Sequence, residues 1–294
     1  MSLHIAIHGK SFSADNRPLM EKLWNVLLEK SCQIVLSAYF KNHLLEHGFE
    51  VGHVESYNEQ TGTPEHVQMA WSIGGDGTLL ETLTHIGNKE LPILGINTGR
   101  LGFLATLSPQ DVRLAVDQLI AGNYRIEERT LVAVHSEIDL FDGKQFGLNE
   151  VGIMKTDTSS MIVIKAYVDG NYLNTYWADG LIVSTATGST GYSLSVGGPL
   201  VMPSSDILII APMSPHNLNV RPLVVSSYAK LKFEISSRSQ NFLISIDSRA
   251  RVIDSKFSIE VQKAPFNAKI IKIPGDDFLQ TLRNKLNWGL DVRN

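Results

Sequence analysis

The first hundred residues alternate between strand-like and helix-like patterns, and this alternation restricts the fold more than any other feature of the sequence. Residues 3–8 form a short apolar run, and Pro18 opens a segment whose leucines recur on one helical face. A second short run at residues 34–36 precedes a helical stretch, and residues 68–73 form another strand candidate that ends in glycines. Strands and helices in this order predict an α/β domain with an open, mostly parallel sheet that carries helices on its faces.

The pattern changes after residue 105. One helix-like stretch, residues 109–121, is followed by many β-rich segments separated by turn signals. An Asp-Gly pair at residues 169–170, between two apolar runs, is typical of a two-residue hairpin, and a second pair at residues 142–143 repeats this signal more weakly. The second part of the chain is therefore expected to form an all-β, sandwich-like domain.

The C-terminus returns to a helical pattern. A Pro-Gly turn at residues 274–275 precedes Asp276 and Asp277, either of which can cap a helix, and apolar residues then recur at four-residue spacing before Gly289. An apolar stripe of this kind requires a partner. We expect this C-terminal helix to pack back on the first domain.

These patterns predict two domains, an α/β domain of residues 1–105 with 275–294 and a β-rich domain of residues 106–274. The composition, 43% hydrophobic and 19% charged with a formal net charge of -4, argues against disorder and against a nucleic-acid-binding protein. Cys32 is the single cysteine and cannot form an internal disulfide. No segment approaches the roughly 18 apolar residues that span a membrane, so we expect an unprocessed, cytoplasmic protein.

The sequence GGDGT at residues 74–78 lies directly between a predicted strand and a predicted helix. Its glycines let the backbone turn sharply and approach a phosphate, and Thr78 and Glu81 have the spacing of a capping box at a helix N-terminus, which attracts anionic oxygens. A carboxylate at the centre of such a turn would repel a phosphate. Asp76 therefore favours a role in taking a proton from a hydroxyl nucleophile or in holding Mg²⁺, the alternative being a solvated aspartate in an ordinary turn.

This pentapeptide resembles the signature of a kinase superfamily that includes NAD kinases, diacylglycerol kinases and, more distantly, phosphofructokinases. Further motifs in the same order make the chain similar to the NAD kinase family over most of its length: LGIN at residues 94–97, LGFL at 101–104, LNE at 148–150, DGLIVSTATGSTGYS at 179–193 and LNWG at 286–289. The resemblance implies ATP-dependent phosphorylation of the 2′-hydroxyl of the adenosine ribose of NAD⁺, which gives NADP⁺.

The resemblance also implies roles for individual residues. Asp76 would act on the ribose hydroxyl that attacks the γ-phosphorus of ATP, Phe103 would pack on the adenine, and Asp179 would contact the nicotinamide side of the substrate. Asn149 and Glu150 would hold the dinucleotide, since an amide beside a carboxylate can both donate to and accept from adenine and ribose. The other binding residues implied by the glycine turn and the family pattern are Gly75, Gly77, Thr78, Thr187, Thr190, Gly191, Tyr192 and Ser195.

The sequence departs from the family pattern at several positions. The family usually has proline in place of Ala186 and alanine in place of Gly191, two changes that could loosen the loop. Residues 247–249 read Asp-Ser-Arg where the family more often shows Asp-Gly-Gln, and no role is assigned to them. Trp177 takes the place of a basic residue found in some members, which leaves the choice between NAD⁺ and NADH open.

The implied ligands are ATP as phosphoryl donor, NAD⁺, and Mg²⁺ or another divalent cation that bridges the donor phosphates. No residue is assigned as a metal ligand, and Asp76 is the one protein group that could help to hold the cation. The resemblance assigns nucleotide binding to the first domain and substrate binding and oligomerisation to the second, and it implies a homodimer or homotetramer. No nucleic acid and no membrane partner is expected. Two other functions stay open: a lipid kinase of the diacylglycerol type, for which the sequence lacks an amphipathic basic helix, and a dinucleotide-binding sensor without catalysis.

Overall fold

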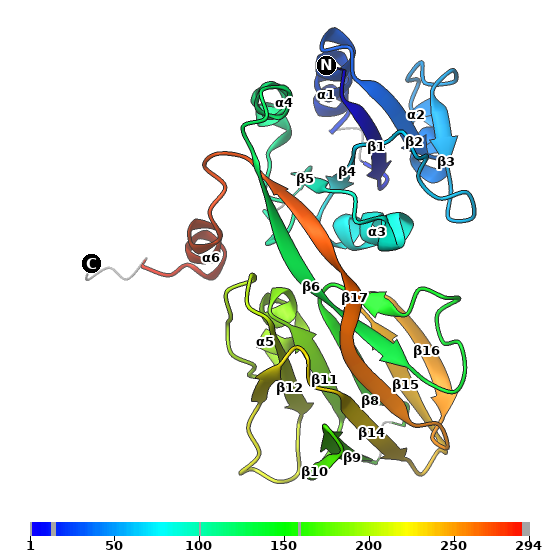
Figure 1. Cartoon of the computed structure of the whole chain (residues 1–294), viewed down its shortest axis with the longest axis vertical. Helices are drawn as coiled ribbons and strands as arrows, with labels where there is room; N and C mark the ends of the chain where they lie inside the picture. The colour runs from blue at the N-terminus through cyan, green and yellow to red at the C-terminus, as the bar shows by residue number, and fades with distance from the viewer. Residues whose placement is uncertain (1, 13–15, 100, 158–159, 290–294) are drawn as a thin grey trace. The chain divides into compact units, whose positions relative to one another are not determined.

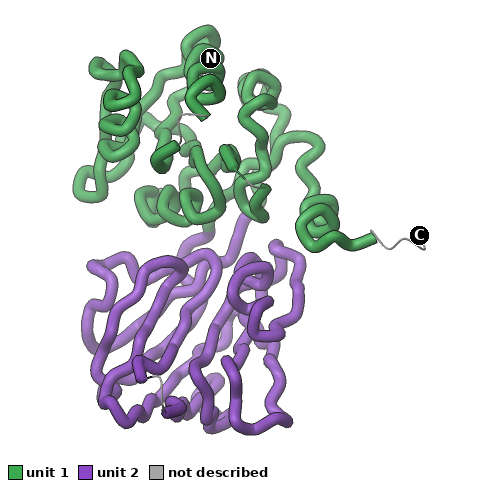
Figure 2. The backbone as a smooth tube through the Cα atoms, turned by 180° about the vertical axis from the view of Figure 1, so that it is seen from behind, with its two compact units in different colours: residues 1–127, 268–294 green, residues 128–267 purple. Residues whose placement is uncertain are grey.

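The computed structural model describes residues 2–12, 16–99, 101–157 and 160–289, and the chain forms two compact units (Figures 1 and 2). Unit 1 comprises residues 1–127 and 268–294, and unit 2 comprises residues 128–267. Unit 1 therefore extends beyond residue 105, where we expected the first domain to end. The reason is that helix α4 (Val112–Ile120) packs against helix α1 (Arg17–Glu29) of the same unit.

Unit 1 contains a parallel sheet with the strand order β5-β4-β1-β2-β3, and the last residues of β17 extend it beside β5, also in parallel. Its strands are β1 (His4–Gly9), β2 (Gln33–Ser37), β3 (Glu55–Tyr57), β4 (Met69–Gly74), β5 (Ile93–Asn97) and β17 (Ile259–Lys272). The expected open parallel sheet is confirmed. Its buried strands are short apolar runs, as expected for a sheet covered on both faces.

Helices cover the two faces of this sheet. In addition to α1 and α4, unit 1 has α2 (Ala38–Glu46), α3 (Asp76–Ile86), α6 (Phe278–Leu286) and the short 3₁₀ helices η2 (Gly87–Lys89) and η3 (Pro109–Asp111). Ile5 and Ile7 of β1 join a core formed with α1, α2 and α4, whereas Ala6 between them faces the opposite side. On that opposite side, Leu79 of α3 lies directly over Gly95 of β5. Successive side chains of each strand point to opposite faces of the sheet, so α1, α2 and α4 cover one face and α3 covers the other.

The C-terminal helix α6 belongs to unit 1. Asp277 caps it by accepting a hydrogen bond from the backbone N–H of Leu279 at 3.0 Å, and Asn287 ends it in the left-handed conformation. The rings of Phe278 and Phe103 lie 6.4 Å apart. The expected packing of this helix on the first domain is confirmed.

Unit 2 consists of two antiparallel sheets. One has the order β10-β9-β14-β17, with β6 beside β17 and β7, and the other has the order β13-β12-β11-β8-β15-β16. The strand bounds are β6 (Arg125–His135), β7 (Phe146–Gly147), β8 (Glu150–Lys155), β9 (Ile162–Val168), β10 (Asn171–Ala178), β11 (Gly180–Thr185), β12 (Ile207–Met213), β13 (Leu223–Ser226), β14 (Leu231–Ser236), β15 (Asn241–Ile246) and β16 (Arg249–Asp254). Strands β6 and β17 carry the chain between the two units.

One hydrophobic core lies between the two sheets of unit 2. Val134, Ile164 and Phe233 come from the first sheet, and Val183 and Phe242 from the second. The expected sandwich-like domain is therefore confirmed. The predicted hairpin is also present between β9 and β10, where the residues at 169 and 170 have φ angles of 49° and 79°, as an Asp-Gly turn allows.

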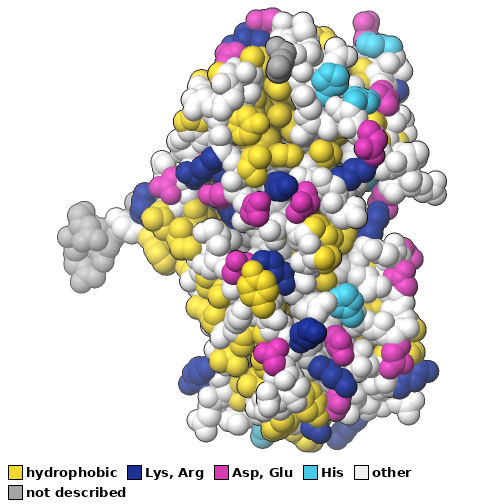
Figure 3. Space-filling model, in the orientation of Figure 1, with side chains coloured by type: hydrophobic (Ala, Val, Ile, Leu, Met, Phe, Trp, Pro, Cys, Tyr) yellow, Lys and Arg dark blue, Asp and Glu magenta, His cyan; other side chains and the backbone are white. Residues whose placement is uncertain are grey.

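The surface carries charges of both signs. On the face shown in Figure 3, basic and acidic side chains lie interspersed. Among the described residues, none of the helices combines the length and the apolar character needed to cross a membrane. Cys32 is buried and free.

Candidate functional site

The glycine turn connects β4 to helix α3, and Gly75 occupies the N-cap position of that helix. A side chain at Gly74 would collide with the Thr78 side chain, so the turn requires glycine there. The expected capping box is wrong, because the helix already begins at Asp76 and no side chain caps it. Thr78 is buried within the first turn, and Glu81 instead forms an ion pair with Lys10 at 2.7 Å.

Asp76 is the first residue of α3. Its carboxylate accepts three hydrogen bonds from successive backbone N–H groups. Oδ2 accepts from Phe103 at 2.8 Å, and Oδ1 accepts from Leu104 and Ala105, both at 3.0 Å. A carboxylate has about four lone-pair directions. Among the described residues three donors are therefore present, which leaves one direction on Oδ2 for a ligand hydroxyl or a cation.

The loop that donates to Asp76, of which residues 98–99 and 101–106 are described, approaches it closely. A Cβ atom at Gly102 would overlap the Asp76 carboxylate, so only glycine permits this arrangement. Asn97 holds the two ends of the loop, since its Oδ1 accepts from Gly99 N–H at 2.8 Å and its Nδ2 donates to Ala105 O at 3.1 Å. The glycines and the asparagine of this segment thus shape the loop around the carboxylate.

Phe103 projects from this loop and is half-buried. Its ring contacts Phe278, and the Lys285 ammonium lies 5.4 Å from its centroid. The same ammonium donates to the carbonyl of Leu101 at 2.6 Å. The C-terminal helix therefore fixes the position of the aromatic ring that the sequence resemblance assigns to adenine.

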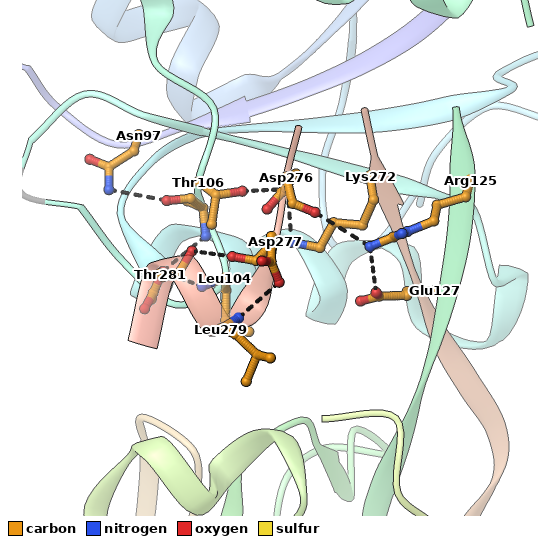
Figure 4. Close-up of polar contacts among 12 residues, drawn as sticks. Asn97, Leu104, Thr106, Arg125, Glu127, Lys272, Asp276, Asp277, Leu279 and Thr281 are labelled. Atoms are coloured by element: carbon orange, nitrogen blue, oxygen red, sulfur yellow. Dashed lines mark hydrogen bonds and ion pairs between the residues drawn. The ribbon is translucent and has the colours of Figure 1, made fainter. Parts of the chain in front are cut away.

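A polar cluster ties the end of this loop to the segment before α6 (Figure 4). The Thr106 hydroxyl donates to Asp276 Oδ2 at 2.7 Å, and Lys272 forms an ion pair with the same oxygen at 2.9 Å. The side chains of Lys272 and Asp276 are only 6% and 11% exposed, so the pair is sheltered from solvent. Removing one partner would leave a buried charge unpaired, and the cluster therefore resists opening.

The predicted binding residues of unit 2 converge on the start of strand β8. Strand β11 pairs with β8 so that Ser184 lies opposite Glu150, and the chain then turns through η4 (Thr187–Thr190) and α5 (Tyr192–Ser195). A Cβ atom at Gly188 would overlap the carbonyl of Asn149, and one at Gly191 would lie 3.1 Å from Glu150 Oε2. The Asn-Glu pair and the 187–195 loop are therefore in direct contact.

Two buried oxygen atoms in this group have no hydrogen-bond partner within the described part of the chain: Glu150 Oε2 and Thr187 Oγ1. Buried polar atoms are normally satisfied, so a ligand is the natural partner for these two. Burial of the carboxyl, with the Asp247 carboxylate nearby, raises the pKa of Glu150 to about 8. The raised pKa favours the protonated form near neutral pH, although the Tyr192 backbone N–H works against it, and that form can donate a hydrogen bond as well as accept one.

The remaining residues of the loop differ in exposure. Thr190 donates from its hydroxyl to the carbonyl of Thr187 at 3.3 Å, which closes the 3₁₀ turn. Tyr192 is 45% exposed, and Ser195 is also exposed. These two side chains are free to meet a ligand without rearrangement of the core.

Asp179 is not part of this group in the structure. It precedes β11, whereas residues 187–195 follow that strand, and six residues at about 3.3 Å each separate the two ends by about 20 Å. Its carboxylate forms an ion pair with Lys155 at 2.6 Å. A ligand that contacts Asp179 must therefore be extended along the strand or replace the Lys155 ammonium.

The turn at residues 247–249, to which the sequence assigned no role, lies against the Asn149-Glu150 segment. Asp247 accepts hydrogen bonds from three N–H groups of residues 148–150. No sequence pattern pointed to this contact, because the partners are about a hundred residues apart in the chain and meet only through the pairing of β15 with β8.

Comparison with known families gives a consistent result. The model of the ATP-NAD kinase N-terminal domain matches residues 5–124, and that of the ATP-NAD kinase C-terminal domain matches residues 148–273. The chain is 47% identical to an NAD kinase of Cytophaga hutchinsonii over 98% of its length and 99% of the relative. It is 40% identical to an NAD kinase of Flavobacterium psychrophilum over 99% of its length and the whole of the relative.

Two solved structures share the fold. Yeast NADH kinase, determined in complex with NADH, superposes with a TM-score of 0.84 at 20% identity and covers 99% of this chain and 89% of its own. An NAD kinase from Archaeoglobus fulgidus, in complex with ATP, gives a TM-score of 0.71 at 24% identity and covers 97% and 98%. At these identities the likeness establishes the fold alone.

Proposed function

The chain belongs to the ATP-NAD kinase family and is a phosphotransferase that phosphorylates NAD with ATP, and from this premise we propose that the phosphoryl group goes to the 2′-hydroxyl of the adenosine ribose, with Asp76 as general base. The geometry of Asp76 carries the proposal. Its carboxylate stands at the N-terminus of α3 and keeps one lone-pair direction on Oδ2 for the substrate. General-base assistance of this kind contributes about 10² to 10⁴ in rate.

The reaction requires one proton transfer and one exchange of P–O bonds. Asp76 Oδ2 takes the proton of the ribose hydroxyl, the hydroxyl oxygen forms a bond to the γ-phosphorus, and the bond from that phosphorus to the bridging oxygen of ADP breaks. The N–H groups at the start of α3, in the Gly75-Asp76-Gly77 turn, have no partners one turn earlier in the helix and can bind phosphate oxygens. Positioning and charge stabilisation supply most of the catalysis in such reactions.

The residues of unit 2 would hold the dinucleotide. Asn149 and the protonated Glu150 offer two donors and two acceptors to adenine or ribose, and the unpartnered Thr187 hydroxyl lies in the same group. Thr190, Gly191, Tyr192 and Ser195 would complete this contact surface. In unit 1, Phe103 would stack on the adenine.

Asp179 would contact the nicotinamide side of the substrate, as proposed from the sequence. The side chains of Lys155 and Asp179 are 24% and 39% exposed, so their ion pair is accessible to a polar group of the substrate. A ligand amide could then share the carboxylate with the ammonium.

Mg²⁺ would be held chiefly by the phosphates of ATP. No group of three or more His, Cys, Asp or Glu side chains that could hold a metal ion occurs among the described residues. Mg²⁺ usually keeps several waters and binds through few carboxylates and the phosphates of its substrate. Asp76 is the one protein group that could help to hold the cation, and only while its free Oδ2 direction is not occupied by the ribose hydroxyl. When bound, the cation would neutralise charge on the transferred phosphoryl group.

We also propose that the enzyme is cytoplasmic and assembles as a homodimer or homotetramer. The exposed apolar side chains of unit 2 support assembly, among them Trp177 at 55% and Tyr228 at 71% exposure. Light scattering on the purified chain would give the mass of the particle, and a monomer at all concentrations would contradict this part.

Formation of NADP⁺ from NAD⁺, ATP and Mg²⁺ tests the function, with NMR of the product to locate the phosphate. Asp76→Asn should lower kcat at least about a hundredfold. Asp142→Asn, which removes an exposed carboxylate on unit 2, is the matched control and should retain full activity. A product phosphorylated elsewhere, or an Asp76→Asn enzyme within tenfold of wild type, would refute the proposal, and a wild type that binds NAD⁺ without turnover would indicate a sensor.

A further inference from the structure

The tight turn at residues 247–249 joins β15 to β16 and directs two charged side chains at one segment, residues 144–150. Asp247 Oδ2 accepts from Leu148 N–H at 2.9 Å, and Oδ1 accepts from Asn149 and Glu150 N–H at 2.8 and 3.2 Å. The backbone N–H of Asp247 donates in return to the carbonyl of Glu150 at 3.0 Å. Four hydrogen bonds thus fix the backbone that carries the Asn-Glu pair.

Arg249 binds the beginning of the same segment from the same turn. Its Nη1 donates to the carbonyl of Lys144 at 2.5 Å, and its Nη2 donates to the carbonyl of Phe146. The guanidinium also lies over the rings of Phe141 and Phe146, at 5.7 and 5.9 Å from their centroids. The Asp247 carboxylate therefore accepts hydrogen bonds from the N–H groups at one end of the segment, and the Arg249 guanidinium donates to the carbonyls at the other end.

The approach of the turn to the segment is very close. A Cβ atom at Gly147 would lie 2.5 Å from Ile246 Cγ2 and 2.9 Å from Asp247 Oδ1, so glycine is required. Strand β7 is only two residues long and pairs with β6. Beyond this short ladder, Thr185 donates to the carbonyls of Leu148 and Asn149. The side chains of the turn bind the N–H groups of residues 148–150 and the carbonyls of residues 144 and 146.

We propose that Asp247 and Arg249 are positioning residues that hold the backbone of Asn149 and Glu150 in the geometry that binds the dinucleotide. This inference rests on the proposed binding role of the Asn-Glu pair. Neither residue is required to touch the substrate, since each acts through the backbone of the 144–150 segment. Their loss should weaken dinucleotide binding without weakening the binding of ATP at the glycine turn of unit 1.

Equilibrium binding of NAD⁺ and of ATP to the full chain tests the inference. Arg249→Gln should raise the Kd for NAD⁺ about five- to twentyfold, equivalent to about 1 to 1.8 kcal/mol, and leave the Kd for ATP within about twofold, because the two lost hydrogen bonds hold only the segment that carries the Asn-Glu pair. Arg249→Lys keeps the charge and one donor and should fall between wild type and Arg249→Gln. Arg251→Gln is the matched control, since Arg251 lies on the same strand, is exposed, and its side chain bonds to the carbonyl of Ala250 and the carboxylate of Asp142 within the described part of the chain.

A second measurement separates positioning from a general loss of structure. Hydrogen–deuterium exchange of the peptide that covers residues 146–152 should be faster in Arg249→Gln and in Asp247→Asn than in wild type, with no change in unit 1. Equal Kd values in Arg249→Gln and Arg251→Gln, or a Kd for ATP that rises as much as that for NAD⁺, would overturn the inference. Because binding is measured without turnover, an enzyme that binds NAD⁺ but forms no NADP⁺ would refute the proposed function and still decide the role of the turn.

Discussion

Asp76 in unit 1 and Asp247 in unit 2 bind their surroundings in nearly the same way. Each carboxylate accepts hydrogen bonds from three successive backbone N–H groups, those of residues 103–105 for Asp76 and of residues 148–150 for Asp247. In both cases the loop it holds carries residues that the family resemblance assigns to the substrate. In both cases a glycine next to the carboxylate, Gly102 or Gly147, makes the close approach possible.

The two sites differ in what surrounds the carboxylate. Asp76 is set at a helix N-terminus in a glycine turn, beside N–H groups that can receive phosphates. Asp247 lies in a hairpin turn with a φ of 51°, next to Arg249 and beneath the segment it holds. If the proposed roles hold, the same arrangement of N–H groups serves a reacting carboxylate at Asp76 and a positioning carboxylate at Asp247. Separate measurements of turnover and of binding distinguish the two roles.

The comparison predicts the largest effect for Gly102→Ala. The added Cβ would overlap the Asp76 carboxylate and displace it from the N–H groups of residues 103–105. We expect kcat to fall by about a hundredfold or more, as in the loss of a general base. Steady-state assays of NADP⁺ formation measure the effect.

The control for this variant is Gly99→Ala in the same loop. A Cβ at Gly99 would meet its nearest atom, Asn97 Oδ1, at 3.9 Å, which is ordinary contact. This enzyme should retain activity within about twofold of wild type. If both variants lose activity equally, the loop responds to any loss of glycine and the contact with Asp76 is not the cause.

Much of the unit 1 site could be predicted from the sequence, because it is local. The glycine turn lies between a strand and a helix, and its residues 74–78 are contiguous, so the pattern alone placed Asp76 at a helix N-terminus. The helix start was misplaced at Thr78, since the capping-box spacing of Thr78 and Glu81 was coincidental and Glu81 pairs with Lys10 instead. Lys10 follows strand β1, and a partner about seventy residues away cannot be predicted from a local sequence pattern.

In unit 2 the sequence singled out candidate residues, but it did not reveal how they are arranged. The motif at residues 179–193 was found, but Asp179 and the 187–195 loop stand at opposite ends of β11, which the linear motif does not reveal. The contact of Asp247 with residues 148–150 depends on the register of β15 with β8, in which Ile246 lies opposite Val151. Register across about a hundred residues is set by the packed sandwich and cannot be derived from turn signals.

A second prediction tests whether the unit 2 group depends on backbone position as the unit 1 group does. A Cβ atom in Gly188→Ala would overlap the carbonyl of Asn149, and backbone cannot move aside as a flexible side chain can. We expect the KM for NAD⁺ to rise about tenfold, with the KM for ATP unchanged. Gly191→Ala is the control, because its Cβ would lie 3.1 Å from the end of the Glu150 side chain, which can shift, and its KM should rise only two- to threefold.

The KM for NAD⁺ of both variants is measured from initial rates at varied NAD⁺ concentration. Should Gly188→Ala leave the KM for NAD⁺ unchanged, the contact between the 187–195 loop and Asn149 would have no part in binding, and the parallel with unit 1 would fail.

A third prediction uses the protonation of Glu150, whose pKa is raised to about 8 by burial and by the Asp247 carboxylate. Between about pH 4.5 and 8 this carboxyl is protonated in the folded chain and ionised in the unfolded chain. The folded state binds the extra proton, so the free energy of unfolding falls as the pH rises through this window, by at most about 1.4 kcal/mol per pH unit. Urea unfolding at pH 5 to 9 measures the slope.

Glu150→Gln removes the titrating group and provides the reference for that slope. The difference in stability between wild type and this variant should favour wild type most at low pH, shrink as the pH rises, and become constant above about pH 8.5. Parallel curves for the two proteins would show that Glu150 does not titrate in this range and is not buried beside Asp247 in the way the structure indicates.

The smallest expected effect concerns the Lys285 ammonium, which lies on the C-terminal helix, whereas the comparable cation of unit 2, Arg249, lies in the turn beside Asp247. It donates to the Leu101 carbonyl and lies over the Phe103 ring, so it steadies the loop that Asp76 holds. Lys285→Met keeps the alkyl chain and removes both interactions. Because an exposed cation–π contact is worth about 0.5–1 kcal/mol, the KM for NAD⁺ should rise about two- to fivefold with kcat nearly unchanged.

Arg283→Met removes a charge from the last turn of the same helix and serves as the control, with an expected KM within about 1.5-fold of wild type. If the two variants behave alike, the effect of Lys285 is one of net charge or helix stability. A rise in KM confined to Lys285→Met would show that the unit 1 loop, unlike the 148–150 segment held by its own turn, depends on the C-terminal helix to present Phe103 to the substrate.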